Sequence, residues 1–312
     1  MRFNEMITGN NEIQVAVMKM EAKEAKNGKV YTLFTLGDGV ATIEARMWEN
    51  PNTLPFKAGV VLDAVIEKST YNDQASYLVK SGKPSNTLIN ELLPHAPIKT
   101  EEASSLIRNT IDGMKDSALK TLTLKLYQDN KEKFLVWTAA AGMHHNYFNG
   151  LLYHTYRMLQ SAHMLANIYP VNKDLLFSAV ILHDLAKLKE YDMDDIGAIT
   201  VTPECTLFGH LVMGIEMINA AAATCGFNRE TDESIRMLKH CLLSHHGALE
   251  YGSPVMPAIK EAMLLHELDT IDARMWKYEV EEEKLEPGTV SEKVFGMNTR
   301  VYRPVFPNPA QS

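Results

Sequence analysis

The sequence predicts an α+β protein with two domains, a small β-barrel at the N-terminus followed by an all-α domain. From Ile13 to Val79 apolar and polar residues alternate, which is the period of a half-buried strand. From about Ser104 onward the apolar residues recur at helical spacing instead. Proline and small polar residues separate the two regions, which is typical of a linker. We therefore predict a barrel at residues 1–83, a linker at 84–105, a helical domain at 106–300 and a C-terminal tail at 301–312.

Short runs of β-forming residues, separated by turns that contain glycine, predict the strands of the barrel. The Asn27-Gly28 turn and the Gly37-Asp38-Gly39 turn each lie between two such runs, as expected for antiparallel hairpins. Five strands within about 70 residues fit a small barrel of the OB-fold type. The predicted strands cover residues 13–17, 30–36, 41–48, 60–67 and 76–79.

Aromatic and basic residues accompany the second and third predicted strands. Tyr31, Phe34 and Trp48 carry flat rings on which nucleic-acid bases can stack. Lys29 and Arg46 lie near them in the sequence and can contact backbone phosphates. Small barrels share such patterns widely, so each ring is also a candidate for packing in the barrel itself. This alternative is strongest for Phe34, because leucines lie on both sides of it.

The C-terminal part of the chain has the apolar spacing of amphipathic helices, with capping residues at the expected ends. Asn172 is suited to begin one helix, and Thr231 or Asp232 another, because their side chains accept hydrogen bonds from free backbone N–H groups. Gly247 is suited to end the latter helix. After amphipathic segments between 104 and 126, the predicted helices cover residues 151–166, 175–190, 209–225, about 232–246 and 257–278.

Side chains that can bind a metal occur in order along these helices. They are His154, the pair His183-Asp184, His210, the pair His245-His246 and Asp269. Imidazoles mixed with carboxylates suit divalent transition metals, and a carboxylate can bridge two of them, for which Asp184 is the natural candidate. A single His-Asp pair is more often a buried polar pair without a metal. The ordered series of histidines and aspartates favours a metal site.

The order His, His-Asp, His, His-His, Asp resembles the HD-domain superfamily of metal-dependent phosphohydrolases. Several segments are also similar to the YhaM family of 3′–5′ exoribonucleases. These are residues 150–155, 182–187, 209–214, 243–254 and 268–274. The segment from Lys29 to Trp48 is similar to the nucleic-acid-binding OB domain at the N-terminus of that family.

The resemblance implies a site for two divalent metals, with manganese as the expected ion. One metal would be held by His154, His183, Asp184 and Asp269, and the other by Asp184, His210 and His245. Lys187 and His246 are expected to stabilise negative charge on the phosphate. Asp272 is expected to support a ligand. His145, next to His144, lies in a stretch that the family places near the mouth of the site, and is expected to contact RNA.

The implied reaction releases nucleoside 5′-monophosphates from the 3′ end of single-stranded RNA by attack of a metal-activated water. Two alternatives remain open. An HD phosphohydrolase could act on a small nucleotide or cyclic dinucleotide, with a regulatory barrel. A DNA-binding protein could hold a structural metal, although six or seven candidate ligands exceed the usual number of about four. Single-stranded DNA is a further candidate substrate, and homo-oligomers would combine several barrels.

The composition is that of an ordinary globular enzyme, with 312 residues, 46% of them hydrophobic, and a formal charge of −8. The negative charge argues against non-specific coating of nucleic acid, which needs local lysine and arginine. Cys205, Cys225 and Cys241 are too widely spaced to predict a disulfide framework or a structural zinc site. No signal peptide or membrane-spanning segment is visible, so the expected location is the cytoplasm, with no membrane partner.

Overall fold

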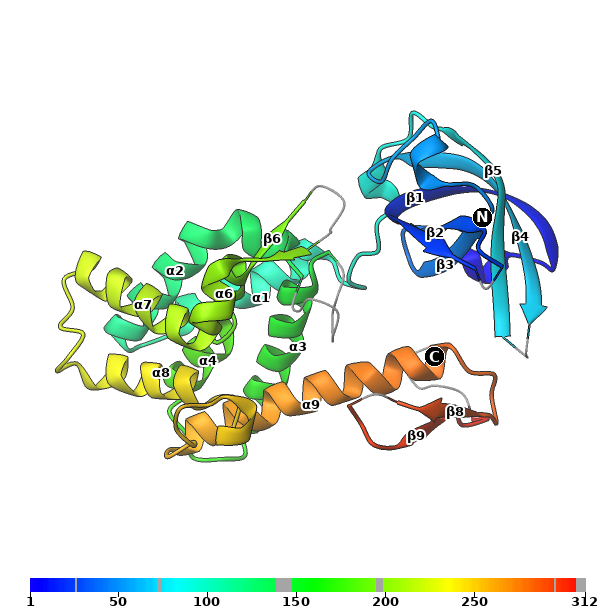
Figure 1. The fold of residues 1–312 in the computed structure, drawn as a ribbon. Helices are drawn as coiled ribbons and strands as arrows, with labels where there is room; N and C mark the ends of the chain where they lie inside the picture. Colours follow the sequence, from blue (N-terminus) through cyan, green and yellow to red (C-terminus); the bar gives the residue numbers. More distant parts are fainter. Residues whose placement is uncertain (26, 72–73, 139–147, 195–198, 295, 307–312) are drawn as a thin grey trace. The chain divides into compact units, whose positions relative to one another are not determined.

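The computed structural model describes residues 1–25, 27–71, 74–138, 148–194, 199–294 and 296–306. The chain divides into two compact units. The first comprises Met1–Pro97, Tyr147–Gly150 and Tyr191–Thr202, and the second Ile98–Asn146, Leu151–Glu190 and Pro203–Ser312. The first contains a barrel and the second is mainly helical, so the predicted α+β class is confirmed (Figure 1). The boundaries at residues 83 and 105 stay a prediction.

The strands of the first unit close into a barrel in the order β1-β2-β3-β5-β4. They are β1 (Gly9–Glu24), β2 (Val30–Gly37), β3 (Thr42–Met47), β4 (Val61–Tyr71) and β5 (Gln74–Pro84). β1 pairs with β2 through its C-terminal half and with β4 through its N-terminal half, and its register shifts between Val17 and Lys19. Such an irregularity bends a strand, which lets β1 belong to both sides of the barrel. β3 and β5 complete the closure as a parallel pair at Arg46 and Leu78.

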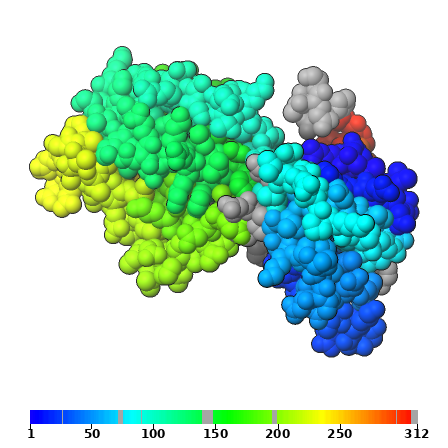
Figure 2. All heavy atoms as spheres, turned by 90° about the horizontal axis from the view of Figure 1, so that it is seen from above, coloured from blue at the N-terminus to red at the C-terminus, as the bar shows by residue number. Residues whose placement is uncertain are grey.

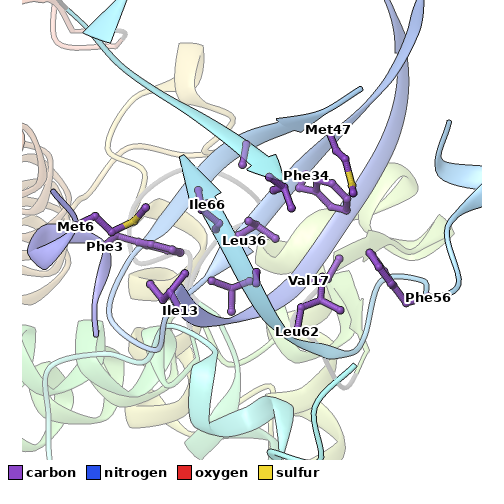
Figure 3. Close-up of a cluster of buried hydrophobic side chains, with 14 residues drawn as sticks. Phe3, Met6, Ile13, Val17, Phe34, Leu36, Met47, Phe56, Leu62 and Ile66 are labelled. Carbon is purple, nitrogen blue, oxygen red and sulfur yellow. The ribbon is translucent and has the colours of Figure 1, made fainter. Parts of the chain in front are cut away.

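Alternate side chains of the strands point into the barrel and form its core. Along β2, Thr32, Phe34 and Leu36 are buried, whereas the side chains between them are partly exposed. Phe34 is fully buried and belongs to the core, which excludes it as a stacking surface. Figure 3 shows the cluster, whose labelled members are Phe3, Met6, Ile13, Val17, Phe34, Leu36, Met47, Phe56, Leu62 and Ile66.

Short 3-10 helices surround the barrel strands, namely η1 (Phe3–Glu5), η2 (Pro51–Thr53) and η3 (Ile89–Leu92). The segment predicted as a linker is partly structured. It contains η3 and the fully buried Leu93, and its last residues already belong to the first helix of the second unit. In a space-filling view the barrel residues are blue to cyan, and the visible residues of the helical unit are mostly green to yellow (Figure 2).

Most predicted helices of the second unit are present. The helices are α1 (Thr100–Gly113), α2 (Ser117–Val136), α3 (Gly150–Leu165), α4 (Lys173–Leu182), α5 (Lys187–Glu190), α6 (Pro203–Leu207), α7 (Gly209–Thr224), α8 (Glu233–Ser244), η4 (Leu249–Tyr251) and α9 (Lys260–Glu283). Asn172 caps α4 by accepting from the backbone N–H of Leu175, and Asp232 caps α8 by accepting from that of Ile235. These predicted caps are confirmed.

The helix predicted over 175–190 is wrong in its middle. α4 ends at Leu182, and the chain turns before α5 begins at Lys187. Across the turn the backbone bonds join residues three apart, from the N–H of Leu185 to the carbonyl of Leu182 and from the N–H of Lys187 to that of Asp184. This tighter winding is a 3-10 pattern, which often marks a functional position within a helix. The apolar periodicity continues through it, so the sequence alone showed one helix.

The part of the chain after the barrel is not purely helical, because it contains two short β-hairpins. They pair β6 (Tyr191–Met193) with β7 (Ile199–Val201), and β8 (Val290–Lys293) with β9 (Arg300–Tyr302). The first residues of the segment predicted as a tail, 301–312, lie in β9, where Val301 is only 1% exposed. Strands of three or four residues are too short to show a period in the sequence. Figure 1 shows α9 leading to the β8-β9 hairpin. None of the helices described could span a membrane.

Candidate metal centre

All the predicted metal ligands lie in the second unit and meet in one cluster. His154 comes from α3, His183 and Asp184 from the turn after α4, His210 from α7, His245 and His246 from the end of α8, and Asp269 from α9. His154, His183, Asp184 and His245 are each at most 3% exposed. The cluster is therefore an interior site, in which electrostatic interactions are stronger than on the surface.

The carboxylate of Asp184 lies between two groups of histidines. Its Oδ2 atom is 3.3 Å from Nε2 of His183 and 3.8 Å from Nε2 of His154. Its Oδ1 atom is 3.6 Å from Nε2 of His210 and 3.9 Å from Nε2 of His245. Oδ1 is buried and accepts no hydrogen bond from the residues that the structure describes. A buried carboxylate oxygen without a donor is costly unless a cation or another donor occupies the space beside it.

Each of these histidine rings presents its Nε2 atom to the cluster because its Nδ1 atom already has a hydrogen-bond partner. Three rings donate Nδ1–H to a backbone carbonyl: His183 to Val180 at 2.9 Å, His245 to Leu242 at 2.8 Å and His246 to Tyr251 at 3.0 Å. A carbonyl oxygen only accepts, so in the neutral ring the hydrogen is on Nδ1 and Nε2 keeps its lone pair. This is the tautomer that a metal ligand needs.

Carboxylates support the other two rings. Nδ1 of His154 lies 2.7 Å from Oδ2 of Asp272, so the expected support of a candidate ligand by Asp272 is geometrically possible. Nδ1 of His210 lies 3.0 Å from Oε1 of Glu190, and the same oxygen accepts the backbone N–H of His210 at 2.7 Å. Glu190 was not predicted, although it follows Lys187 by three residues, about one helical turn. A hydrogen-bonded carboxylate behind a histidine fixes its ring and raises its basicity as a ligand.

Two close approaches between Nε2 atoms indicate where cations fit. They are 3.3 Å between His154 and His183, and 3.2 Å between His210 and His246. Two facing lone pairs repel unless a cation or a proton lies beside them. The donor atoms form two groups, each within 4.8 Å, one of His154, His183 and Asp184 and the other of His210, His245 and His246. This donor set fits divalent transition metals.

The electrostatics of the cluster also favour a cation. Burial alone would lower the pKa of His154, but the hydrogen bonds that its ring donates to Asp269 and Asp272, with the charges of these carboxylates, outweigh burial and raise that pKa to about 10. Nε2 of His154 is 3.3 Å from Oδ1 of Asp269. Burial raises the pKa of Asp269, but the hydrogen bond with His154 and the positive charges of His154 and His183 together outweigh burial and hold that pKa well below its usual value. A position that binds a proton so strongly is also favourable for a metal ion, which competes with that proton.

Lys187 lies within the cluster, with Nζ 2.7 Å from Oδ2 of Asp184. Burial lowers the pKa of Lys187, but the charge and hydrogen bond of Asp184, together with the charges of Asp269 and Glu190, outweigh this effect and raise it. The side chain therefore carries a fixed positive charge beside the ligands, as expected for a group that faces phosphate.

The chain bends sharply where α8 ends. Gly247 has a φ of +82°, which favours glycine, and a Cβ atom there would lie 2.2 Å from the ring of His266. That ring donates Nδ1–H to the carbonyl of His245 at 2.8 Å. Only a residue without a side chain allows this approach, so Gly247 helps to orient the histidine pair.

Some histidines lie elsewhere. Nε2 of His163 lies 2.9 Å from the hydroxyl of Thr110, and His240 accepts the backbone N–H of Ala258 at 2.9 Å, so both rings bind partners outside the cluster. His145 and its neighbour His144 lie outside the described residues.

The predicted nucleic-acid residues of the barrel share one outer face. The rings of Tyr31 and Trp48 are 5.4 Å apart, and Nζ of Lys29 lies 5.6 Å from the centre of the Trp48 ring. Trp48 is 44% exposed. Arg46 is exposed and pairs with Leu33 across β2 and β3, on the same face as Tyr31. The strands β2 and β3 carry the ligand face of OB-folds.

Comparison with known proteins agrees with both units. The HD-domain family model matches residues 151–274. The chain is 33% identical to the 3′-5′ exoribonuclease YhaM of Bacillus velezensis over 90% of this chain and 91% of that protein. It is 31% identical to the protein of that name in Bacillus subtilis over 96% of both chains, and 33% identical to that of a Geobacillus strain over 90% of this chain and 88% of the relative. The chain therefore belongs to the YhaM family of HD-domain proteins.

Proposed function

We propose that the protein is a metal-dependent 3′–5′ exoribonuclease that hydrolyses single-stranded RNA to nucleoside 5′-monophosphates. The family relatives carry the name 3′-5′ exoribonuclease, and the helical unit matches the HD domain. The observation that best supports the proposal is the position of Asp184, whose two oxygens face different histidine groups. A carboxylate in that position can bridge two cations at the spacing that phosphodiester hydrolysis uses.

We assign His154, His183, Asp184 and Asp269 to one cation. His210, His245, His246 and the second oxygen of Asp184 would hold the other. The sequence suggested His246 as a group that stabilises phosphate charge, but its contact with His210 supports a ligand role instead. Manganese is the expected ion, as the resemblance to the YhaM family implies. Bound cations would act as Lewis acids and lower the pKa of a water molecule toward neutrality.

The protein's own residues would orient the reaction. The carbonyls and carboxylates behind Nδ1 keep each histidine ring fixed. Lys187 would place a positive charge near the phosphate oxygens, where it stabilises the charge that develops in the transition state. Because Asp184 is buried and the side chain of Lys187 is only 12% exposed, the ammonium group is held in place and needs little reorganisation when the substrate arrives.

The barrel would bind the RNA strand upstream of the cleaved end. Tyr31 and Trp48 offer stacking faces, and Lys29 and Arg46 supply positive charge on the same surface. Stacking is tolerant of sequence, which suits an exonuclease. We also propose that the enzyme acts in the cytoplasm, and that homo-oligomers let several barrels hold one RNA. Single-stranded DNA presents similar bases and phosphates and is a second substrate to be compared.

The proposal is tested by incubating metal-stripped protein with a 5′-labelled single-stranded RNA and with manganese, magnesium or no metal. The expected result is a manganese-dependent ladder that shortens from the 3′ end, with nucleoside 5′-monophosphates as products. If RNA stays intact while a small nucleotide or cyclic dinucleotide is hydrolysed, the proposal is wrong and the barrel has a regulatory role. A parallel single-stranded DNA substrate measures the preference for RNA.

Replacing Trp48 by alanine is expected to raise KM for a long RNA about 10-fold with little change in kcat, because stacking contributes about 1–3 kcal/mol per base. Hydrolysis of a dinucleotide, which has no upstream nucleotides for the barrel to bind, should be unaffected. Tyr169→Ala is the control, since Tyr169 is 51% exposed in the helical unit. An unchanged KM for the long RNA would remove Trp48 from the proposed binding face.

A further inference from the structure

Arg157 lies on α3 one turn after His154, and its guanidinium group contacts two carboxylates of α9. Its Nε atom donates to Oδ1 of Asp272 at 2.6 Å. Its two terminal nitrogens donate to the two oxygens of Glu279, at 2.7 and 2.9 Å. The second oxygen of Asp272 lies 2.7 Å from Nδ1 of His154. A continuous chain of hydrogen bonds therefore runs from Glu279 through Arg157 and Asp272 to a candidate metal ligand.

The two carboxylates that support ligand rings are stabilised in different ways. Glu190 is the last residue of α5, and its carboxylate lies at the N-terminus of α7, where the backbone N–H of His210 donates to it at 2.7 Å. A helix N-terminus provides free N–H groups and favours negative charge. Asp272 is 5% exposed and lies in the middle of α9, where backbone N–H groups are committed to the helix. A buried carboxylate at such a position needs a charged partner, and Arg157 provides one.

We propose that Arg157 is a positioning residue that fixes Asp272, and through it the ring of His154, and thereby sets the affinity of the His154 group for a divalent cation. This inference rests on the metal-dependent function proposed above and deepens it. The planar guanidinium group is suited to the role because it binds Asp272 and Glu279 at once in a fixed geometry. Its side chain is 20% exposed and stacks beside Tyr153, with the guanidinium carbon 5.4 Å from the centre of that ring.

Loss of Arg157 would release Asp272. Its carboxylate would then lose the hydrogen bond and the positive charge that Arg157 provides at Oδ1, and a buried carboxylate that loses a charged partner rotates or takes up a proton. Either change removes the fixed acceptor behind His154, so Nε2 of that ring is no longer held toward His183 and Asp269. The second histidine group does not depend on this chain, because His210 is supported by Glu190.

The test is a titration of metal-stripped protein with manganese. Binding is measured by calorimetry or from the electron paramagnetic resonance signal of free Mn²⁺. In Arg157→Gln we expect one class of site to weaken about 10- to 100-fold, the usual effect of losing a support behind a ligand, and the other class to stay within about 3-fold. Arg108→Gln is the matched control. It removes the same charge from an exposed pair with Asp112 on α1, so a general electrostatic effect would appear in both variants.

A purely structural role for Arg157 predicts a lower melting temperature with unchanged manganese affinity in the folded protein, and that result would overturn the inference. If Arg157→Gln does not fold, Glu279→Gln takes its place. Glu279 is 47% exposed, and its loss should weaken the same class of site several-fold. Unchanged affinity in Glu279→Gln would then count against the inference. Wild-type protein that binds no divalent metal would instead refute the proposed function itself.

Discussion

Replacing Asp184 by asparagine is expected to lower the rate of RNA hydrolysis by about 10³-fold or more, a loss of about 4 kcal/mol of transition-state stabilisation. Burial disfavours the charged carboxylate, but Lys187 and His183 outweigh this effect and hold the pKa of Asp184 well below its usual value. The group is therefore an anion at neutral pH. Asparagine keeps the shape of the side chain but loses its charge. Its amide nitrogen replaces one of the two carboxylate oxygens and cannot bind a cation, so the side chain could serve only one of the two histidine groups.

Asp129→Asn is the control for this variant. Asp129 also pairs with a lysine, Lys125, at 2.8 Å, but its side chain is 54% exposed on α2. We expect normal activity there, because exposed ion pairs contribute little. Asp184→Asn leaves the buried Lys187 without its partner, so its melting temperature should fall as well. Rates are therefore compared well below that temperature, with circular dichroism to show the fold. Activity within 10-fold of wild type in Asp184→Asn would contradict the bridging role.

The sequence allowed the cluster of candidate ligands to be predicted because each member is a chemically distinctive residue on or next to a strongly periodic helix. His154, His210 and Asp269 lie on separate helices, and the structure brings them together with the His183-Asp184 pair. The barrel was predictable for a similar reason. Alternation along β2 and glycine-bearing turns are local signals, and they fix which side chains face inward.

The features that were missed depend on contacts between distant parts of the chain. Nothing in the sequence indicates that Arg157 contacts Asp272 and Glu279, because both follow it by more than 100 residues. The turn after α4 was hidden because a 3-10 turn keeps nearly the same apolar spacing as an α-helix. The pairing of β8 with β9 was hidden because Val301 is buried by tertiary contacts and not by any local pattern.

Replacing Phe34 by alanine is expected to unfold the barrel while the helical unit keeps its metal site. Phe34 is fully buried, and its ring lies 6.4 Å from that of Phe56 across the barrel core. Truncating a buried phenylalanine costs about 3–5 kcal/mol, because packing is lost and a cavity remains. A small domain has about 5–15 kcal/mol of stability in total, so this loss is a large part of it. The helical unit has a core of its own.

The measurement compares manganese affinity, hydrolysis of a dinucleotide and KM for a long RNA in Phe34→Ala and in Ile7→Ala. Ile7 belongs to the same unit but is 70% exposed, so its truncation removes an apolar side chain without opening the core. We expect Phe34→Ala to retain metal binding and dinucleotide hydrolysis and to lose affinity for long RNA, whereas Ile7→Ala resembles wild type. If Phe34→Ala melts the barrel but binds long RNA normally, the barrel does not hold the substrate. The helical unit would then have to bind the RNA strand by itself, and a regulatory barrel would become the better explanation.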